Sequence, residues 1–230
     1  MKKIAIIAAM SKEIAELKKL LSNVEEKETD GIKFITGDLH GKEVVLMESG
    51  IGKVCAAVKT TELINLFKPD CVINSGVAGG IGDNVEKMDV VAGVETVYND
   101  VWCLEPNEFG QVQGFPARFC GCRTLLEKLN AGDNDGVTVH KGLICSGDKF
   151  IAGIDEAKAV RRLFNDGLAV DMESCAVAQV CHMKNVPFLA LRIISDNPLK
   201  NDDNFNEYKD FWGEMAERSF KILKKLLMSL

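Results

Sequence analysis

The chain has 230 residues, of which 47% are hydrophobic and 27% are charged, and its formal net charge at pH 7 is −6. This is an ordinary globular composition with enough apolar residues for a substantial core, and the negative balance offers no basic surface for nucleic acid. No stretch approaches the ~20 apolar residues of a membrane span, and the short apolar run after Lys2 and Lys3 passes at once into a charged segment, which predicts a first strand and not a signal peptide.

The eight cysteines predict neither disulfides nor a metal site. Cys120 and Cys122 form the only close pair, and no second pair stands at zinc-ligand spacing. Others stand in apolar surroundings and are interpreted as small buried hydrophobic residues: Cys55, Cys71, Cys145, Cys175 and Cys181. We therefore expect reduced thiols in a cytoplasmic protein that binds no metal.

Strand and helix patterns alternate from the N-terminus. Residues 2–8 predict an apolar strand, and Ser11 is placed to cap a helix that extends to about Leu21. Two further strands, 32–39 and 43–48, are predicted on either side of His40-Gly41, because this dipeptide is a hairpin signal.

Two glycine-rich segments each follow a predicted strand. The first, 49–52, opens a helix over 53–67 that ends before a proline. A strand over 71–74 leads into the second glycine-rich segment, 75–80, which is interpreted as a loop, and another strand covers 89–97. The G-x-G-x-x-G spacing before a helix and the G-x-x-x-x-G-K-[ST] loop are both missing, so the sequence carries no dinucleotide or phosphate-loop fingerprint.

The second half of the chain continues the alternation. It predicts strands over 137–144, 168–171 and 187–194, and helices over 155–164, over 174–184 and from near 205 to the C-terminus. Continuous Val- and Ile-rich strands between helices are typical of a buried, largely parallel sheet. We therefore expect one α/β domain over 1–230.

Small or polar residues follow strand after strand in the predicted sheet, namely at 10–13, 49–52, 75–80, 146–151, 172–173 and 195–196. Because ligands bind at the carboxyl ends of strands in open α/β sheets, we expect these segments to share one pocket.

Single residues among these segments also have interpretations that involve no ligand. Glu13 suits the first turn of an exposed helix, Asp196 suits a turn, and Phe150 suits the core. Asp171 is interpreted as structural, on the strand face opposite Met172.

The motifs in combination are more specific than any of them alone. They are IAAMSKEI (7–14), ESGIGKVCAA (48–57), INSGVAGG (73–80), SGDKFI (146–151), AVDMES (169–174) and LRIISDNP (191–198). Over essentially the whole chain, their order and spacing resemble the methylthioadenosine/S-adenosylhomocysteine nucleosidases of the nucleoside phosphorylase-like superfamily. The resemblance implies a three-layer α/β/α fold around a mixed, mostly parallel sheet, a homodimer, no metal or organic cofactor, and a place in methionine salvage.

The resemblance also implies a reaction, the hydrolysis of the N-ribosidic bond of 5′-methylthioadenosine and S-adenosylhomocysteine, with 5′-deoxyadenosine as a further candidate. Asp196 resembles the general acid that protonates the leaving adenine on its five-membered ring, with Ser195 supporting it. Glu13 resembles the residue that deprotonates the attacking water. Glu173 resembles the residue that binds the ribose hydroxyls, assisted by Met172.

The remaining positions that match the family are expected to bind substrate. Phe150 would stack on adenine and the backbone of Ile151 would read its edge, while Arg192 would hold the carboxylates in place. The sugar and its 5′-substituent would be lined by Met10, Ile51 and Phe205, and Val77 would lie near the water.

The chemistry requires these carboxyl groups to differ in charge. Adenine is a poor leaving group unless it is protonated, so Asp196 must hold a proton near neutral pH, far above its reference pKa of ~3.9. Glu13 must be ionised to accept a proton from water. Ionised Glu173 would stabilise the positive charge that builds on the sugar, as carboxylates do in glycoside hydrolysis.

The sequence departs from the family pattern at several positions. Val77 stands where many members have Ser, and Asn99-Asp100 stands where His-Asp is common. An aromatic residue that reaches a neighbouring subunit is expected between 102 and 115, where Trp102, Phe109 and Phe115 are candidates. These departures leave the preferred 5′-substituent open, so a nucleosidase for aminofutalosine or another 5′-modified purine nucleoside is an alternative.

Two further alternatives belong to other classes of protein. A nucleoside phosphorylase would need cationic contacts for phosphate in the segment where this chain has Met10-Ser-Lys-Glu13, and a carboxylate there repels phosphate although Lys12 attracts it. A non-catalytic nucleoside-binding protein on the same fold would not need three carboxylates.

Overall fold

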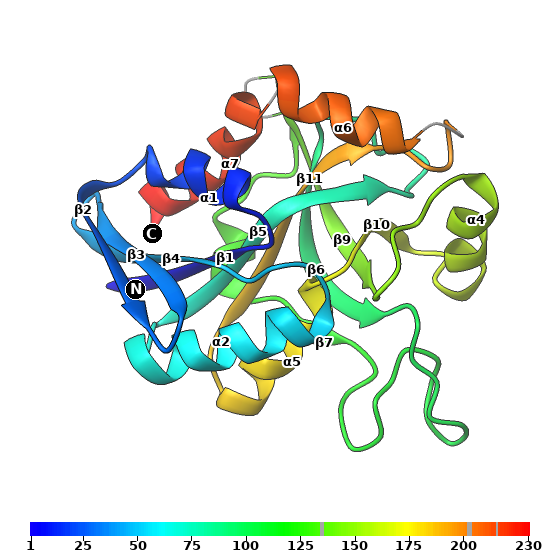
Figure 1. The fold of residues 1–230 in the computed structure, drawn as a ribbon. Coiled ribbons are helices and arrows are strands. Elements are labelled where there is room, and N and C mark those ends of the chain that lie inside the picture. The colour runs from blue at the N-terminus through cyan, green and yellow to red at the C-terminus, as the bar shows by residue number, and fades with distance from the viewer. Residues whose placement is uncertain (134–135, 202–203, 215) are drawn as a thin grey trace.

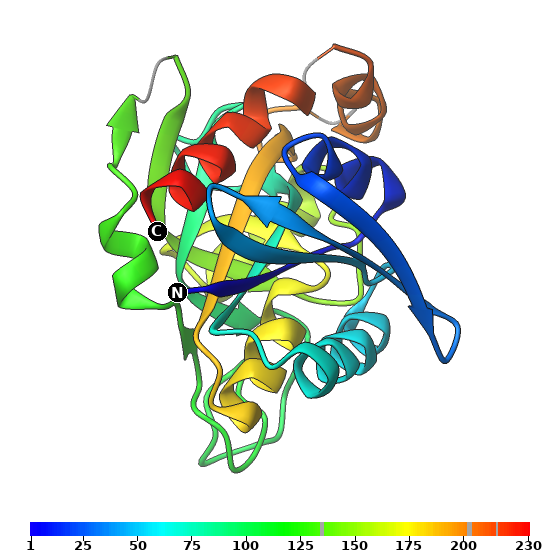
Figure 2. The same cartoon turned by 90° about the vertical axis from the view of Figure 1, so that its left-hand side faces the viewer.

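The computed structural model describes residues 1–133, 136–201, 204–214 and 216–230, with side chains except those of 133 and 212–220. It confirms the α/β fold: a curved mixed sheet lies between helices on both of its faces (Figure 1). Helices α1 (Ser11–Lys18) and α7 (Ala216–Ser229) cover one face. Helices α2 (Lys53–Phe67) and α5 (Ser174–Lys184) cover the other, as the turned view in Figure 2 also shows.

The alternation of side chains along the first strand, β1 (Lys3–Ala8), explains the three layers. Ile4 and Ile6 pack into the cluster that includes Leu17 of α1. Ala5 and Ile7 face the other way, into the cluster that includes residues of α2 and α5. Since every second residue of a strand points to the same face, an uninterrupted apolar strand supplies two cores at once.

The strand order is β10-β9-β6-β11-β5-β1-β4-β3-β2. The bounds are β2 (Ser22–Thr29), β3 (Ile32–Leu39), β4 (Lys42–Glu48), β5 (Cys71–Gly80), β6 (Val90–Tyr98), β9 (Thr138–Ser146), β10 (Gly167–Asp171) and β11 (Phe188–Asp196), and the short strands β7 (Phe119–Cys120) and β8 (Gly132–Asp133) lie off this path. Pairing is parallel for β1 with β4 and β5, for β5 with β11, and for β9 with β6 and β10.

The sheet closes on itself beside these parallel strands. Strand β10 pairs with β9 and also, antiparallel, with the end of β5 through Ala169–Gly80 and Val170–Gly79. Strands β5, β11, β6, β9 and β10 therefore form a ring. Because of this closure, the ends of β5, β10 and β11 converge on one place.

Several predictions of local structure are wrong. The second glycine-rich segment is not a loop, because β5 continues through Gly80 between β11 and β10. Strand β2 was not predicted, because its sequence SNVEEKET is polar and exposed throughout and it is held by backbone pairing with β3. Ser11 is the first residue of α1 and makes no cap, α1 ends at Lys18 and not at Leu21, and Cys55 is exposed and not buried.

The C-terminal part also differs from the prediction of one long helix. It contains α6 (Asn204–Glu214) followed by α7, while α3 (Arg123–Glu127) and α4 (Ile154–Leu163) complete the helices of the described chain. Within the part of the chain that the structure describes, no helix has both the length and the apolar character needed to cross a membrane.

Candidate active site

A cavity of about 330 Å³ lies where the ends of β5, β10 and β11 converge. It receives side chains from eleven of the twelve positions predicted from the sequence: Met10, Glu13, Ile51, Val77, Phe150, Met172, Glu173, Arg192, Ser195, Asp196 and Phe205. The twelfth, Ile151, lines a small adjoining cavity together with Phe150, Met172 and Asp196. The structure therefore confirms that the segments at the strand ends share one pocket.

Glu13 lies in the first turn of α1 and points inward. Its side chain is 1% exposed, so it does not sit on an exposed helix face. Oε2 accepts the Met10 N–H at 2.9 Å and Oε1 accepts the Val77 N–H at 3.0 Å. Burial raises the pKa of Glu13, whereas the Arg192 guanidinium and the backbone donors oppose this rise by stabilising the anion. A carboxylate with a raised pKa is a stronger base, which suits proton abstraction from water.

The position of Glu13 explains why β5 carries glycine beside it. A Cβ built on Gly76 would lie 2.7 Å from Glu13 Oε1 and closer still to a guanidinium nitrogen of Arg192. Only a residue without a side chain allows both charged groups to approach the strand.

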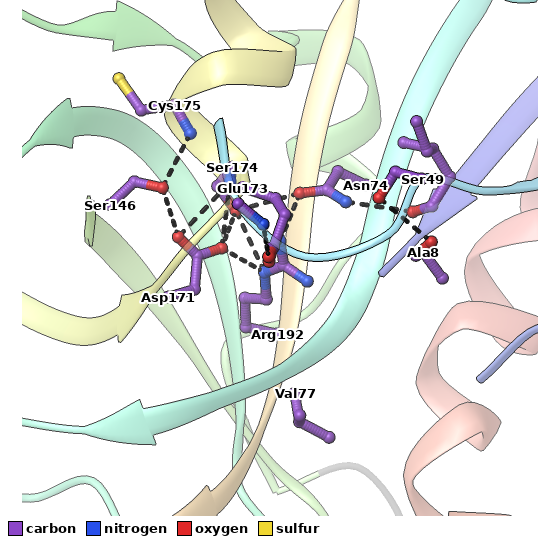
Figure 3. Close-up of polar contacts among 12 residues, drawn as sticks. Ala8, Ser49, Asn74, Val77, Ser146, Asp171, Glu173, Ser174, Cys175 and Arg192 are labelled. Carbon is purple, nitrogen blue, oxygen red and sulfur yellow. Dashed lines mark hydrogen bonds and ion pairs between the residues drawn. The ribbon is translucent and has the colours of Figure 1, made fainter. Parts of the chain in front are cut away.

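Arg192 is the centre of a buried polar network (Figure 3). Its Nε lies 2.6 Å from Asp171 Oδ2 and 3.0 Å from Ser174 Oγ, and its Nη2 donates to Asn74 Oδ1. Asp171 accepts the Ser146 hydroxyl at 2.5 Å and the Ser174 hydroxyl as well. Asp171 is thus occupied by protein donors, in line with the structural role predicted for it.

Glu173 follows β10 on the pocket side of this network. Oε1 accepts the Gly52 N–H at 2.9 Å, and Oε2 lies 3.8 Å from Nη2 of Arg192. Burial raises the pKa of Glu173 to about 7, against the opposing effect of Arg192. The side chain can therefore bind a hydroxyl group in either protonation state and becomes anionic at or above neutral pH.

Asp196 ends β11 and is 2% exposed. Oδ1 accepts the Ser195 hydroxyl at 2.6 Å, and Oδ2 accepts the Nδ2 amide of Asn204 at 2.8 Å. Burial raises the pKa of Asp196, and these two donors partly offset it. Such a carboxyl group keeps its proton to a higher pH than an exposed aspartate, as a general acid requires.

Aromatic side chains form another part of the cavity wall. The Phe150 ring contacts Phe205 edge-on at 5.8 Å and Tyr208 at 5.6 Å between centroids. Phe150 is 37% exposed and Phe205 is 50% exposed, so Phe150 does not lie in the core and both rings are open to a planar ligand. The Tyr208 hydroxyl lies 3.3 Å from Met10 Sδ, which joins α6 to the start of α1.

Asn204 and Tyr208 were missed by the sequence reasoning. Tyr208 had a signal, because it lies three residues after Phe205 and so shares its face of a helix. Asn204 had none, since its contact with Asp196 depends on where α6 docks.

Val77 contributes its backbone N–H to Glu13, and its side chain lies apart from the polar network in Figure 3. In the described residues, no three His, Cys, Asp or Glu side chains are grouped to hold a metal ion.

A second, more open cavity of about 640 Å³ continues outward from the first. The two share Ala9, Met10, Ile51 and Tyr208. The outer cavity adds the charged residues Lys12, Glu48 and Lys209. The inner cavity, with its aromatic side chains and the carboxyl groups of Glu13, Glu173 and Asp196, thus opens into an outer cavity that charged residues line.

Comparison with known proteins gives one consistent result. The family model of the phosphorylase superfamily matches residues 3–228. The 5′-methylthioadenosine/S-adenosylhomocysteine nucleosidase of Staphylococcus aureus (strain MRSA252) is 37% identical over 229 residues, which are 99% of this chain and 100% of that protein. The crystal structure of the nucleosidase of the same name from Neisseria meningitidis, in complex with methylthio-immucillin-A, matches with a TM-score of 0.93 and 36% identity over 100% of both chains. A futalosine hydrolase mutant of Helicobacter pylori matches with a TM-score of 0.90 and 28% identity, also over 100% of both chains. The chain therefore belongs to the phosphorylase superfamily.

Proposed function

We propose that this protein is a purine nucleosidase that hydrolyses the N-ribosidic bond of 5′-methylthioadenosine and S-adenosylhomocysteine. The observation that carries the proposal is the gathering of three buried carboxyl groups, those of Glu13, Glu173 and Asp196, around one cavity with an aromatic wall. The relatives named above at 36–37% identity over the full chain support the same substrates.

The reaction divides between two carboxyl groups. Asp196 gives its proton to the five-membered ring of adenine while the bond between the sugar C1′ and adenine N9 breaks, and the bonding electrons leave with the base. Water attacks C1′, and its proton passes to Glu13. One water is consumed, and adenine and the 5-thio-substituted ribose are released. The proton taken up by Glu13 then passes to solvent and Asp196 takes one up from solvent, which restores both carboxyl groups for the next turnover. Burial favours the protonated form of Asp196, whereas at Glu13 the Arg192 guanidinium and two backbone N–H groups stabilise the anion against the burial that raises its pKa.

Glu173 acts on the sugar. Its carboxylate accepts the ribose hydroxyls and lowers the energy of the cationic sugar in the transition state. Phe150 stacks on adenine, with the backbone of Ile151 at its edge, and Met172 contacts the ribose. Met10, Ile51 and Phe205 surround the 5′-substituent, Ser195 supports the acid, and Val77 places its N–H on the water-activating carboxylate.

Hydrolysis is favoured over phosphorolysis by the position of the charges. Glu13 lines the inner cavity, where its carboxylate would repel a phosphate and would compete with it for Arg192, the one cation that the described residues contribute to the lining. Lys12 lines the outer cavity and is absent from the lining of the inner one. The outer cavity accommodates the longer 5′-substituent of S-adenosylhomocysteine, whose amino-acid end carries both an ammonium and a carboxylate group.

The protein is further proposed to act as a cytoplasmic homodimer without a metal or organic cofactor. Val54 and Val58 lie one turn apart on α2 and are 73% and 55% exposed, so they form an exposed apolar strip that supports a protein contact on this helix. All eight cysteines are free thiols, as a reducing compartment would keep them.

The test is a panel of 5′-substituted adenosines incubated with the purified protein in phosphate-free buffer, with released base and free sugar measured. We expect adenine from 5′-methylthioadenosine and S-adenosylhomocysteine without phosphate, and none from Asp196→Asn, whose fold is checked by thermal melting. Release that requires phosphate would make the protein a phosphorylase, and preference for aminofutalosine would reassign the substrate. An Asp196→Asn variant as active as the wild type would refute the assigned acid.

A further inference from the structure

The side chain of Asn204 joins two parts of the pocket that are far apart in sequence. It begins α6 and is 1% exposed. Its Nδ2 donates to Asp196 Oδ2 at 2.8 Å and to the Ile151 carbonyl at 3.1 Å, and its Oδ1 accepts the Gly153 N–H at 3.1 Å. One amide therefore ties the end of β11 to the segment after β9 that carries Phe150.

The partners of this amide fix its orientation. The Ile151 carbonyl can only accept and the Gly153 N–H can only donate, so a flipped amide would face a like group on each side. The group that Asn204 presents to Asp196 is thus always a donor. The Ser195 hydroxyl differs, because it has one proton and two acceptors within reach, Asp196 Oδ1 at 2.6 Å and the Ala78 carbonyl at 3.3 Å.

This difference matters when Asp196 changes its protonation state. A hydrogen bond that is donated to a carboxyl group favours the charged form. Ser195 can turn toward Ala78 while Asp196 is neutral, whereas Asn204 stays in place. When Asp196 has given up its proton, the Asn204 N–H already faces the new negative charge, so no reorganisation is needed at that moment.

We propose that Asn204 is a positioning residue that orients the Asp196 carboxyl group toward the adenine-binding segment and stabilises the anion left by proton transfer. This inference rests on the proposed function, in which Asp196 is the general acid. Asn204 itself is not proposed to touch the reacting atoms.

The test compares the pH profile of kcat/KM for Asn204→Ala, Asn204→Ser and the control Asn206→Ala, an exposed asparagine in the same helix. Loss of a hydrogen bond to a charged group predicts a fall in kcat of about 10- to 100-fold for Asn204→Ala. The basic limb of its profile should move upward by about one pH unit, since the carboxylate of Asp196 loses a donor and holds its proton more tightly. Asn204→Ser keeps a donor and should recover part of the rate, and Asn206→Ala should match the wild type.

The outcomes separate this inference from its alternatives. A folded Asn204→Ala enzyme that loses rate while its basic limb stays at the wild-type pH would overturn the proposal, because a purely structural role gives that result. If Asn204→Ala does not fold, Asn204→Leu replaces it, since it keeps the approximate shape, removes the donor and adds no charge beside Asp196. A reduced rate with an unmoved basic limb in that variant would equally overturn the proposal. A wild-type protein that releases no adenine instead refutes the proposed function.

Discussion

Glu173→Gln should make the protein more stable and less active at the same time. The pKa of Glu173 is about 7 in the folded protein, against 4.5 for an unperturbed glutamate. This difference of about 2.5 in pKa, at ~1.4 kcal/mol for each pKa unit, corresponds to a cost of about 3.5 kcal/mol for ionising Glu173 inside the folded protein.

The direction of the change in stability with pH follows from whether the folded or the unfolded protein releases the Glu173 proton at the lower pH. Below pH 4.5 the carboxyl group is neutral in both states, so it adds no pH dependence. Between pH 4.5 and about 7 the unfolded chain loses the proton while the folded protein keeps it, and the folded protein therefore loses stability as pH rises. Above pH 7 the full cost is present. Glutamine never ionises, so the variant should gain stability relative to wild type across this window.

The assay is urea unfolding of wild type and Glu173→Gln at several pH values from 4.5 to 8. We expect the difference in free energy of unfolding to grow by about 2–3 kcal/mol between the two ends, equivalent to a melting-temperature gain of roughly 4–12 °C for a chain of this size. Adenine release should fall by at least about 100-fold because the anionic contact to the sugar is lost. Glu28→Gln, an exposed glutamate of β2, is the matched control.

A difference in stability that stays constant with pH would refute this reasoning, as would a variant less stable than wild type at pH 8. Either result would mean that Arg192 and the Gly52 N–H compensate fully for the burial of the charge.

Three other substitutions test separate features of the site. Gly76→Ala should lower both the melting temperature and adenine release, because its Cβ would collide with Glu13 and Arg192; an unchanged melting curve would contradict the close approach. Asp171→Asn should destabilise the protein by about 3–5 kcal/mol in urea unfolding, since it leaves the buried Arg192 without its nearest carboxylate; a loss under 1 kcal/mol would show that Arg192 finds another partner. Lys12→Glu combined with Lys209→Glu should reduce kcat/KM for S-adenosylhomocysteine by about 3- to 10-fold while changing that for 5′-methylthioadenosine less than about twofold, because in the proposed binding mode only the longer substituent extends into the outer cavity that these lysines line. Lys158→Glu, an exposed lysine of α4, is the control, and equal effects on both substrates would exclude a contact with the tail.

The sequence was most informative where a local pattern has one spatial consequence. Apolar runs identified the central strands, and the rule that ligands gather at the carboxyl ends of parallel strands brought segments such as 10–13 and 172–173 to one cavity. The closure of the sheet through β10 and β5 was not predictable, because the antiparallel pairs Ala169–Gly80 and Val170–Gly79 depend on how the ring curls. The glycines of β5 were interpreted as a loop because the reason for Gly76, the room needed by Glu13 and Arg192, lies elsewhere in the chain.

The groups that contact each site residue were the second feature that the sequence could not predict. Glu13 was predicted from the sequence as a site residue. The sequence did not predict that two backbone N–H groups donate to its carboxylate or that its helix points this side chain inward. The role of an ionisable group depends on its burial and on its neighbours. Asn204 and Tyr208 illustrate this, because both enter the site only through the docking of α6 against the strand ends.

The proposed division of work between Glu13 and Asp196 depends on the placement of one guanidinium group, that of Arg192. Burial raises the pKa of both carboxyl groups, so burial alone cannot make one a base and the other an acid. Arg192 acts on Glu13 and Glu173 and favours their anions, and backbone N–H donors reinforce this at Glu13. Asp196 receives neutral donors from Asn204 and Ser195, and the lysine that acts on it, Lys87, contributes less than either. Arg192 therefore opposes the effect of burial at Glu13 and Glu173 and does not do so at Asp196, and this is the difference that the proposed division of work requires.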